Sequence, residues 1–223
     1  MVNREEPLAA ANCIHSAKLC SGPAFSSQPL RSLFSALCPP LPYTDSVTSD
    51  VSTSPQQSIH RIVLTGFMGS GKSTVGPRLA RALGWRFVDA DEAIAAEAGM
   101  TIPEIFGTRG EAGFRLLEQQ VIARLIDEDH LVLALGGGAI ETEASRTLLL
   151  SHPATRLVHL EVTLETTLRR CQGTEGDRPV FADHANLKAR YDRRLPLYRL
   201  AHVNLDANQA TPAQLVERIT ADL

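Results

Sequence analysis

A glycine-rich stretch followed by lysine and serine offers the clearest chemistry in this sequence. Residues 66–73 fit the phosphate-loop pattern G-x-x-x-x-G-K-[ST] at every fixed position. Glycines let backbone N–H groups curl around a phosphate, and a helix that begins here directs more N–H groups at the same anion. Lys72 can then reach the β- and γ-phosphates, and Ser73 can hold Mg²⁺. The pattern favours nucleotide binding over a plain Gly/Ser turn, because Lys-Ser must also fall at the helix start.

Two carboxylates, Asp89 and Asp91, follow a short apolar stretch. In an extended segment this spacing puts both side chains on one face. One can support Mg²⁺ beside Ser73, while the other holds or deprotonates an acceptor hydroxyl. The competing interpretation is a turn in which Asp91 caps the next helix.

Arginines and a run of glycines are further candidates for binding anions. Arg115 lies one turn into an expected helix, and the alternative to a binding role is a surface salt bridge to Glu118. The glycines at 136–138 end an apolar run, where they form a hinge or free backbone N–H groups for an anion. Arg178 falls in a stretch, 172–183, that predicts a mobile surface loop. A loop arginine either stays solvated or swings onto a transferring phosphoryl group.

Strands alternate with helices along residues 60–223. We expect strands at 61–65, 85–88, 131–135, 156–160 and 201–205. Two helical pieces are expected after residue 91, and Gly107 and Gly110 interrupt the second of them. We expect the other helices at 72–83, 111–126, 142–150, 163–171, 184–195 (up to Pro196) and 211–222. This alternation predicts an α/β fold with a parallel sheet covered on both faces, where ligands bind at the carboxyl ends of the strands.

Composition narrows the class of protein. The chain has 223 residues, a formal net charge of −3 and 43% hydrophobic residues, which suit one domain of ordinary size. The mild acidity argues against a general nucleic-acid binder, and no apolar run reaches the roughly 18–20 residues that span a bilayer. Three of the four cysteines lie in the first forty residues at spacings that match no zinc site. We therefore expect a reduced compartment, the cytoplasm, and no membrane or nucleic-acid partner.

Residues 1–59 differ from the rest. Serine and proline are dense between 17 and 55 without a sustained period of 2 or 3.6, so we predict a disordered leader before a domain at 60–223. Residues 7–44 contain no acidic residue, which is typical of a targeting peptide. They contain only two Lys or Arg residues, Lys18 and Arg31, which argues against one. Targeting to a plastid or another compartment is therefore an alternative, as is a plain tail or a start codon placed too early.

Together the motifs resemble the shikimate kinase family of P-loop small-molecule kinases. The resemblance covers about residues 60–223 and rests on 66–76, 87–91, 105–118, 136–138, Arg178-Pro179 and 194–198, in the family's order and near its spacing. It implies a three-layer α/β/α architecture like that of nucleoside-monophosphate kinases, with a five-stranded parallel sheet. It also implies transfer of the ATP γ-phosphoryl group to the 3-hydroxyl of shikimate, a step of aromatic amino-acid biosynthesis.

The resemblance also implies roles for single residues. On the nucleotide side it implies that ATP is bound by Gly69, Ser70, Gly71, Lys72, Ser73, Thr74, Arg170, Arg178 and Pro212. Ser73 and Asp89 would support Mg²⁺, and Arg178 would be the lid arginine. On the acceptor side, Asp91 would bind the hydroxyls and act as the base or orienting group, Arg115 and Arg194 would clamp the carboxylate, and Gly136, Gly137 and Gly138 would donate backbone hydrogen bonds.

The chemistry of the residues agrees with that acceptor. Shikimate is a small carboxylate with three hydroxyls. Its carboxylate needs the planar guanidinium group of an arginine, and its hydroxyls need a protein carboxylate. The expected partners are shikimate and ATP, bound by a monomer. One alternative is a related kinase such as gluconate kinase. This chain is distinguished from it by Arg115, Arg194 and the glycines at 136–138. The other alternative is a non-catalytic ATP-binding regulator, which is disfavoured by the presence of Lys72, Asp89, Asp91 and Arg178.

Overall fold

The computed structural model describes residues 58–172 and 184–223. Residues 1–57 of the predicted leader lie outside this part of the chain. So does the predicted loop at 173–183, which contains Arg178.

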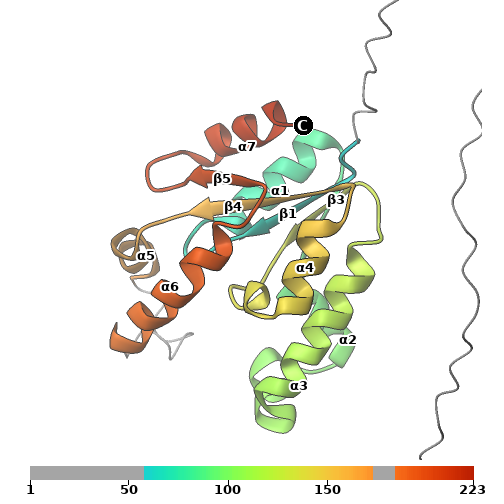
Figure 1. Ribbon diagram of the computed structural model, residues 1–223, viewed down its shortest axis with the longest axis vertical. Helices are drawn as coiled ribbons and strands as arrows, with labels where there is room; N and C mark the ends of the chain where they lie inside the picture. The colour runs from blue at the N-terminus through green and yellow to red at the C-terminus, as the bar shows by residue number, and fades with distance from the viewer. Residues whose placement is uncertain (1–57, 173–183) are drawn as a thin grey trace, which may run out of the picture. The chain divides into compact units, whose positions relative to one another are not determined.

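Five parallel strands form one sheet in the order β2-β3-β1-β4-β5 (Figure 1). The strands are β1 (Arg61–Thr65), β2 (Arg86–Asp89), β3 (Leu131–Ala134), β4 (Thr155–Glu161) and β5 (Val203–Asp206). The central strand β1 pairs with both β3 and β4, and all of its residues are buried. This burial on both faces is why its sequence reads as a continuous apolar run rather than as an alternating one. The predicted five-stranded parallel sheet is confirmed.

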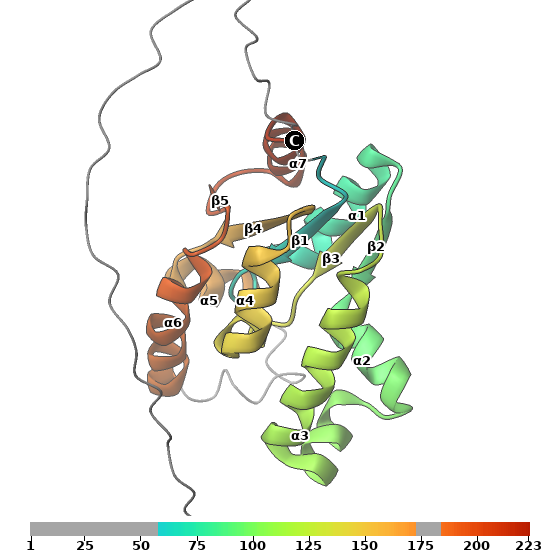
Figure 2. The same cartoon turned by 45° about the vertical axis from the view of Figure 1, so that its right-hand side comes forward.

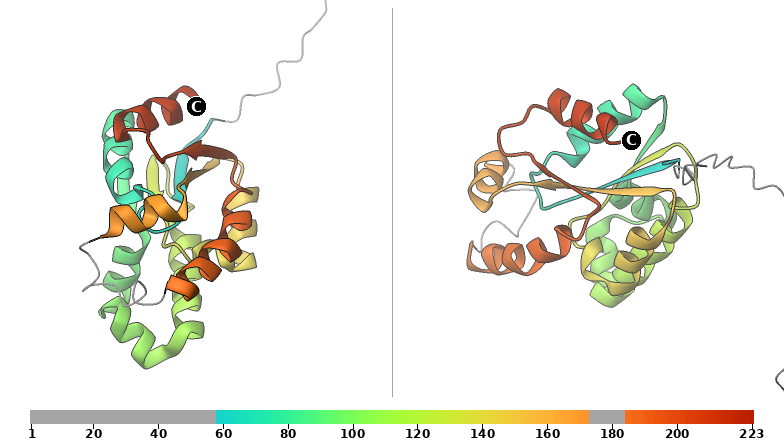
Figure 3. Two further views of the ribbon diagram at one scale, coloured as in Figure 1. Left: turned by 90° about the vertical axis from the view of Figure 1, so that its left-hand side faces the viewer. Right: turned by 45° about the horizontal axis from the view of Figure 1, so that its top comes forward.

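Helices cover both faces of the sheet. Figure 2 and the right-hand view of Figure 3 show α1 and α7 on one side of the strands and α3, α4 and α6 on the other. Ile62 and Leu64 pack in the core cluster of the first side, and Val63 packs in that of the second. The helical segments are α1 (Lys72–Leu83), α2 (Ala90–Ala98), α3 (Ile102–Leu125), η1 (Ala139–Glu141), α4 (Glu143–Ser151), α5 (Leu164–Cys171), α6 (His184–Tyr198) and α7 (Pro212–Ala221). The three-layer α/β/α architecture is confirmed.

Helix α3 differs from its prediction at one of two glycines. Only Gly110 leaves the helical conformation, with φ 67° and ψ −177°, and it kinks the helix there. Gly107 stays helical, because a glycine in a helix is destabilising by only about 1 kcal/mol relative to alanine and does not by itself break the helix. A capping box opens α3, since the Thr101 hydroxyl accepts from the Glu104 backbone and the Glu104 carboxylate accepts from the Thr101 backbone.

Helix α6 does not end before Pro196, as the sequence predicted, but runs through it to Tyr198. Proline removes one backbone hydrogen bond, and this loss is tolerated near a helix end. The backbone N–H of Arg199 still donates to Leu195 at 3.1 Å and closes the last turn. The extra turn brings the hydroxyl of Tyr198 to the carbonyl of Gly137.

Within the two described stretches, no helix combines the length and apolarity that crossing a bilayer requires.

Candidate active site

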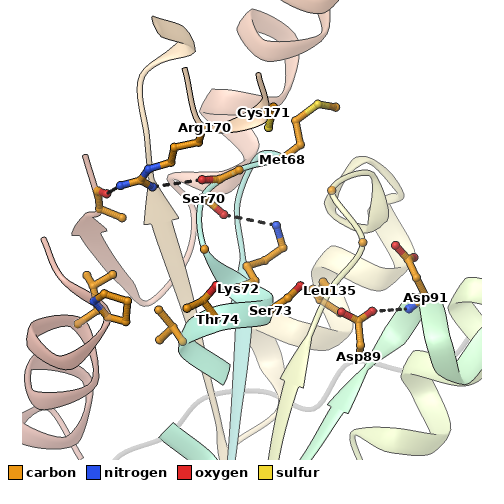
Figure 4. Close-up of a pocket in the computed structure, with 18 of the residues that line it drawn as sticks. Met68, Ser70, Lys72, Ser73, Thr74, Asp89, Asp91, Leu135, Arg170 and Cys171 are labelled. Carbon is orange, nitrogen blue, oxygen red and sulfur yellow. Dashed lines mark hydrogen bonds between the residues drawn. The ribbon is translucent and has the colours of Figure 1, made fainter. Parts of the chain in front are cut away.

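A cavity of about 770 Å³ opens at the carboxyl ends of the strands. Figure 4 shows its walls, which come from the loop after β1, the start of α1, the end of β2 and the segments after β3 and β5. The lining residues include most of those predicted from sequence, namely Gly69, Ser70, Gly71, Lys72, Ser73, Thr74, Asp89, Asp91, Gly136, Gly137, Arg170, Arg194 and Pro212. The fold thus gathers at one sheet edge side chains that are far apart in sequence.

The phosphate loop is built on glycines in conformations that other residues rarely adopt. Gly66 has φ 144°, and a Cβ there would lie 2.6 Å from the carbonyl oxygen of Leu160. Gly71, with φ 100°, precedes the first turn of α1, and the N–H of Val75 donates to its carbonyl at 2.8 Å. The N-terminus of α1 therefore faces the cavity, where an anion gains from its N–H groups and dipole.

Lys72 folds back over this loop. Its ammonium donates to the carbonyl of Gly66 at 2.8 Å, to that of Phe67 at 3.2 Å and to Ser70 Oγ at 3.4 Å (Figure 4). These acceptors are neutral, so a phosphate oxygen can compete for the same protons with a stronger, charge-assisted bond.

Arg170 and Pro212 lie at the rim of the cavity beside the β5–α7 connection. The Arg170 guanidinium donates to the carbonyls of Gly69 at 3.1 Å, Ala207 at 2.7 Å and Asn208 at 3.0 Å. Three backbone contacts from two segments fix its orientation. Pro212 is the first residue of α7, which opens with a capping box from Thr211.

The expectation that Asp89 and Asp91 share one face of an extended segment was wrong. The strand ends at Asp89, and the Asp89 carboxylate caps α2 by accepting from the N–H of Asp91 at 3.0 Å. The competing interpretation chose the wrong aspartate, because the helix begins two residues earlier than it assumed. Asp91 therefore lies in the first turn of α2, yet both carboxylates still line the cavity.

Each of the three consecutive glycines after β3 adjoins one predicted acceptor side chain. A Cβ on Gly136 would lie 2.7 Å from Asp91 Oδ1, and one on Gly137 would lie 3.5 Å from Arg194 Nη1. A Cβ on Gly138 would collide with the guanidinium of Arg115. Glycines at 136 and 138 thus allow the close approach of Asp91 and Arg115, and the run brings one carboxylate and two arginines together.

Arg115 is held in a buried ion pair rather than in the surface salt bridge considered from the sequence. Its Nη1 lies 2.7 Å from Glu118 Oε2, and the Glu118 side chain is only 1% exposed. Burial raises the pKa of Glu118, and Arg115 opposes that rise. Burial by itself lowers the pKa of Arg115, but Glu118 and Glu111 outweigh it, so the guanidinium stays charged. Arg115 and Gly138 are not among the residues that line the cavity but lie directly behind them.

Arg194 is 8% exposed and lines the cavity. Its Nη2 donates to Glu141 at 2.8 Å, whereas its buried Nε has no hydrogen-bond partner among the described residues. A buried unpaired donor is destabilising by about 1–3 kcal/mol.

Sequence reasoning missed two contributors to this wall. Tyr198 donates from its hydroxyl to the carbonyl of Gly137 at 2.5 Å, and Glu141 binds Arg193 and Arg194. Tyr198 was part of a recognised motif but had no role there. The only signal for Glu141 was its position three residues after the glycine run.

Ser73 and Asp89 are oxygen donors on the nucleotide side of the cavity. Within residues 58–172 and 184–223, no cluster of three or more His, Cys, Asp or Glu side chains could enclose a metal ion. This donor set suits Mg²⁺, which takes one or two protein oxygens and completes its shell with phosphates and water.

Comparisons with known proteins show the family to which this chain is similar. The family model described as shikimate kinase matches residues 68–223. A shikimate kinase of Salinibacter ruber is 40% identical over 175 residues, covering 72% of this chain and 85% of that protein. One of Mycobacterium ulcerans is 42% identical over 168 residues, with coverages of 73% and 89%. A solved structure of Acinetobacter baumannii shikimate kinase in complex with shikimate is 37% identical, with a TM-score of 0.67 over 74% of this chain and 92% of the other.

Proposed function

This chain belongs to the shikimate kinase family, and we propose that the residues around its cavity divide that family's reaction between a nucleotide side and an acceptor side. The protein is a phosphotransferase that uses ATP to convert shikimate to shikimate 3-phosphate, a step of aromatic amino-acid biosynthesis. The observation that carries the division of roles is the glycine run at 136–138. It adjoins Asp91, Arg194 and Arg115 at one edge of a cavity whose other edge is the phosphate loop.

On the nucleotide side, Lys72 exchanges its neutral carbonyl partners for the β- and γ-phosphate oxygens of ATP. The N–H groups of Gly69, Ser70 and Gly71 and of the first turn of α1, at Ser73 and Thr74, bind the same phosphates. Arg170 and Pro212 border the adenine. Ser73 and Asp89 hold Mg²⁺, which when bound neutralises charge on the phosphates.

On the acceptor side, Arg115 and Arg194 bind the carboxylate of shikimate, and N–H groups of the glycine run add hydrogen bonds. Asp91 accepts a hydrogen bond from the 3-hydroxyl and takes its proton as the oxygen attacks the γ-phosphorus. The bond from that phosphorus to the β–γ bridging oxygen then breaks, and ADP leaves. Chemistry of this kind depends mainly on positioning and charge neutralisation, which is what these fixed groups supply.

Two parts of the proposal rest on the sequence alone. Arg178 acts on the transferring phosphoryl group, and it belongs to the residues outside the described stretches. The protein acts as a monomer in the cytoplasm.

The test is an ADP-release assay with ATP and magnesium and with shikimate, gluconate or a nucleoside monophosphate as acceptor. We expect turnover with shikimate and a loss of at least about 10²-fold in Lys72→Met, because a fixed charge facing the transferred group is removed. Lys188→Met is the matched control, since Lys188 is an exposed residue of α6 that pairs with Asp192 away from the cavity. ADP release with gluconate or a nucleoside monophosphate but not with shikimate would overturn the proposal.

A further inference from the structure

Glu141 connects three arginines at the wall of the acceptor site. It is the last residue of η1, and its side chain is 20% exposed. Its Oε1 receives both Nε and Nη2 of Arg193 at 2.8 Å. Its Oε2 receives Nη2 of Arg194 at 2.8 Å and lies 3.9 Å from Nη2 of Arg115.

The two arginines that share Oε2 come from different helices. Arg115 lies on α3 and Arg194 on α6, so their separation depends on how these helices sit over the sheet edge. A planar carboxylate is bound best by guanidinium groups fixed in a matching orientation. Glu141 supplies one negatively charged point toward which both guanidinium groups are drawn.

The electrostatic balance keeps Glu141 ionised. Burial raises the pKa of Glu141, but hydrogen bonds and charge from Arg194 and Arg193 outweigh it and leave the pKa below its usual value. Arg115 is anchored separately by Glu118 through Nη1. Removing Glu141 would therefore release Arg194 and Arg193 while leaving Arg115 with its main partner.

We propose that Glu141 is a positioning residue for the acceptor carboxylate. It fixes Arg194 against Gly137 and near Arg115, so that the donors of Arg194 that Glu141 leaves unused meet the carboxylate of shikimate. The proposal rests on the proposed function, because it concerns the same acceptor. Glu141 would affect the binding of shikimate indirectly, by positioning Arg194.

The experiment compares Glu141→Gln and Glu141→Ala with Glu143→Gln in the full-length chain. Glu143 is exposed and lies two residues further on, at the first turn of α4, so its variant removes the same charge outside the arginine cluster. The readouts are kcat, KM for shikimate and KM for ATP from ADP release, together with the thermal midpoint. Glu141→Asp, which keeps the charge on a shorter side chain, serves as the conservative variant.

We expect KM for shikimate to rise about threefold in Glu141→Gln and about tenfold in Glu141→Ala, because misplacement of a binding group by about 1 Å can cost up to about 10²-fold. KM for ATP should stay within about twofold in both, and Glu141→Asp should lie between wild type and Glu141→Ala. Glu143→Gln should match wild type.

Three outcomes would overturn the proposal. An unchanged KM for shikimate, or a fall in kcat and thermal midpoint alone, would show that Glu141 is only structural. A lower KM for shikimate in Glu141→Gln would show that Glu141 competes with the substrate carboxylate for Arg194. Failure of the wild-type protein to use shikimate refutes the proposed function instead, and the positioning role falls with it, so the two failures are distinguished by the wild-type assay.

Discussion

The hydroxyl of Tyr198 donates to the backbone carbonyl of Gly137 at 2.5 Å. Tyr198 is 1% exposed, and its ring stacks on His159 with a centroid distance of 5.2 Å. Burial raises the pKa of the Tyr198 hydroxyl, so it remains a protonated donor. In a trans peptide, the carbonyl of Gly137 and the N–H of Gly138 point in opposite directions. By fixing the carbonyl, Tyr198 therefore fixes the direction of that N–H.

The first prediction is that Tyr198→Phe raises KM for shikimate several-fold with little change in KM for ATP. The ring keeps its stack on His159, but the carbonyl of Gly137 loses its donor. The free energy of unfolding should fall by about 1–3 kcal/mol, the range for leaving a buried polar group unsatisfied. Steady-state kinetics and urea denaturation check both parts.

Tyr191→Phe is the matched control for Tyr198→Phe. Tyr191 lies on the same helix, and its hydroxyl also donates to a backbone carbonyl, that of Val162, at 2.9 Å. We expect a similar loss of a hydrogen bond without the shift in KM for shikimate. Equal kinetic effects in the two variants would contradict a specific role for the contact between Tyr198 and Gly137.

The second prediction concerns Arg115, whose removal affects both stability and substrate use. Arg115→Ala leaves the carboxylate of Glu118 buried without its partner at 2.7 Å, which should destabilise the fold by about 3–5 kcal/mol. Arg115→Lys keeps the charge and should lose much less stability. It should still raise KM for shikimate, because an ammonium lacks the planar fork that binds a carboxylate.

Thermal melting and kinetics of the two Arg115 variants side by side provide the measurement. Titration with ATP should give nearly the wild-type affinity for Arg115→Lys. A wild-type KM for shikimate in Arg115→Lys, or an equal loss of ATP affinity, would argue against a carboxylate-binding role.

The third prediction is a loss of stability as the pH falls below about 6.5. Burial lowers the pKa of His159 below its ordinary value of 6.5, with smaller effects from neighbouring groups. The unfolded chain therefore binds a proton at a higher pH than the folded one does. Stability from the neutral ring is complete above 6.5 and declines as the pH falls towards the folded pKa, by at most about 1.4 kcal/mol per pH unit.

Urea denaturation at pH 7.5 and 5.5 measures this dependence. In His159→Asn the drop in the free energy of unfolding between the two pH values should be smaller than in wild type by about 1 kcal/mol. His130→Asn is the control, because His130 is exposed and its φ of 56° is one that asparagine also adopts. The idea fails if both variants keep the full wild-type dependence.

The fourth prediction is that a chain starting at Ser58 keeps the wild-type thermal midpoint and turnover. Close to this point, the N–H of His60 donates to the carbonyl of Ala154 at 2.9 Å, so the described contacts of the domain are retained. A chain starting at Ile62 should be unstable, because it lacks Arg61, which is 6% exposed and donates to Asp129 at 2.7 Å and to the carbonyl of Glu128 at 2.8 Å. Loss of activity in the first truncation would show that residues 1–57 contribute to the domain.

Local patterns in the sequence were sufficient for the fold and for the position of the phosphate loop. Apolar runs mark the central strands β1 and β3, and α1 spans 72–83 as predicted. These features depend on residues close together in the chain, whose spacing directly reports burial and helix capping. Asp89 marks the limit of this reasoning. A difference of two residues in the helix start changed which aspartate caps α2.

The acceptor half could be named by family resemblance, but only one of its charge pairs could be read from the sequence. The i,i+3 spacing indicated that Arg115 pairs with Glu118, but not that this pair is buried. Glu141 holds Arg194 because η1 and α6 meet at one sheet edge. No local pattern encodes the partner of a charged residue on another element. The sequence therefore determined the sheet, the phosphate loop and the types of side chain available, whereas only tertiary packing decided which charges meet. Ion pairs between different elements depend on the distances between those elements, and the order of residues in the chain does not determine these distances.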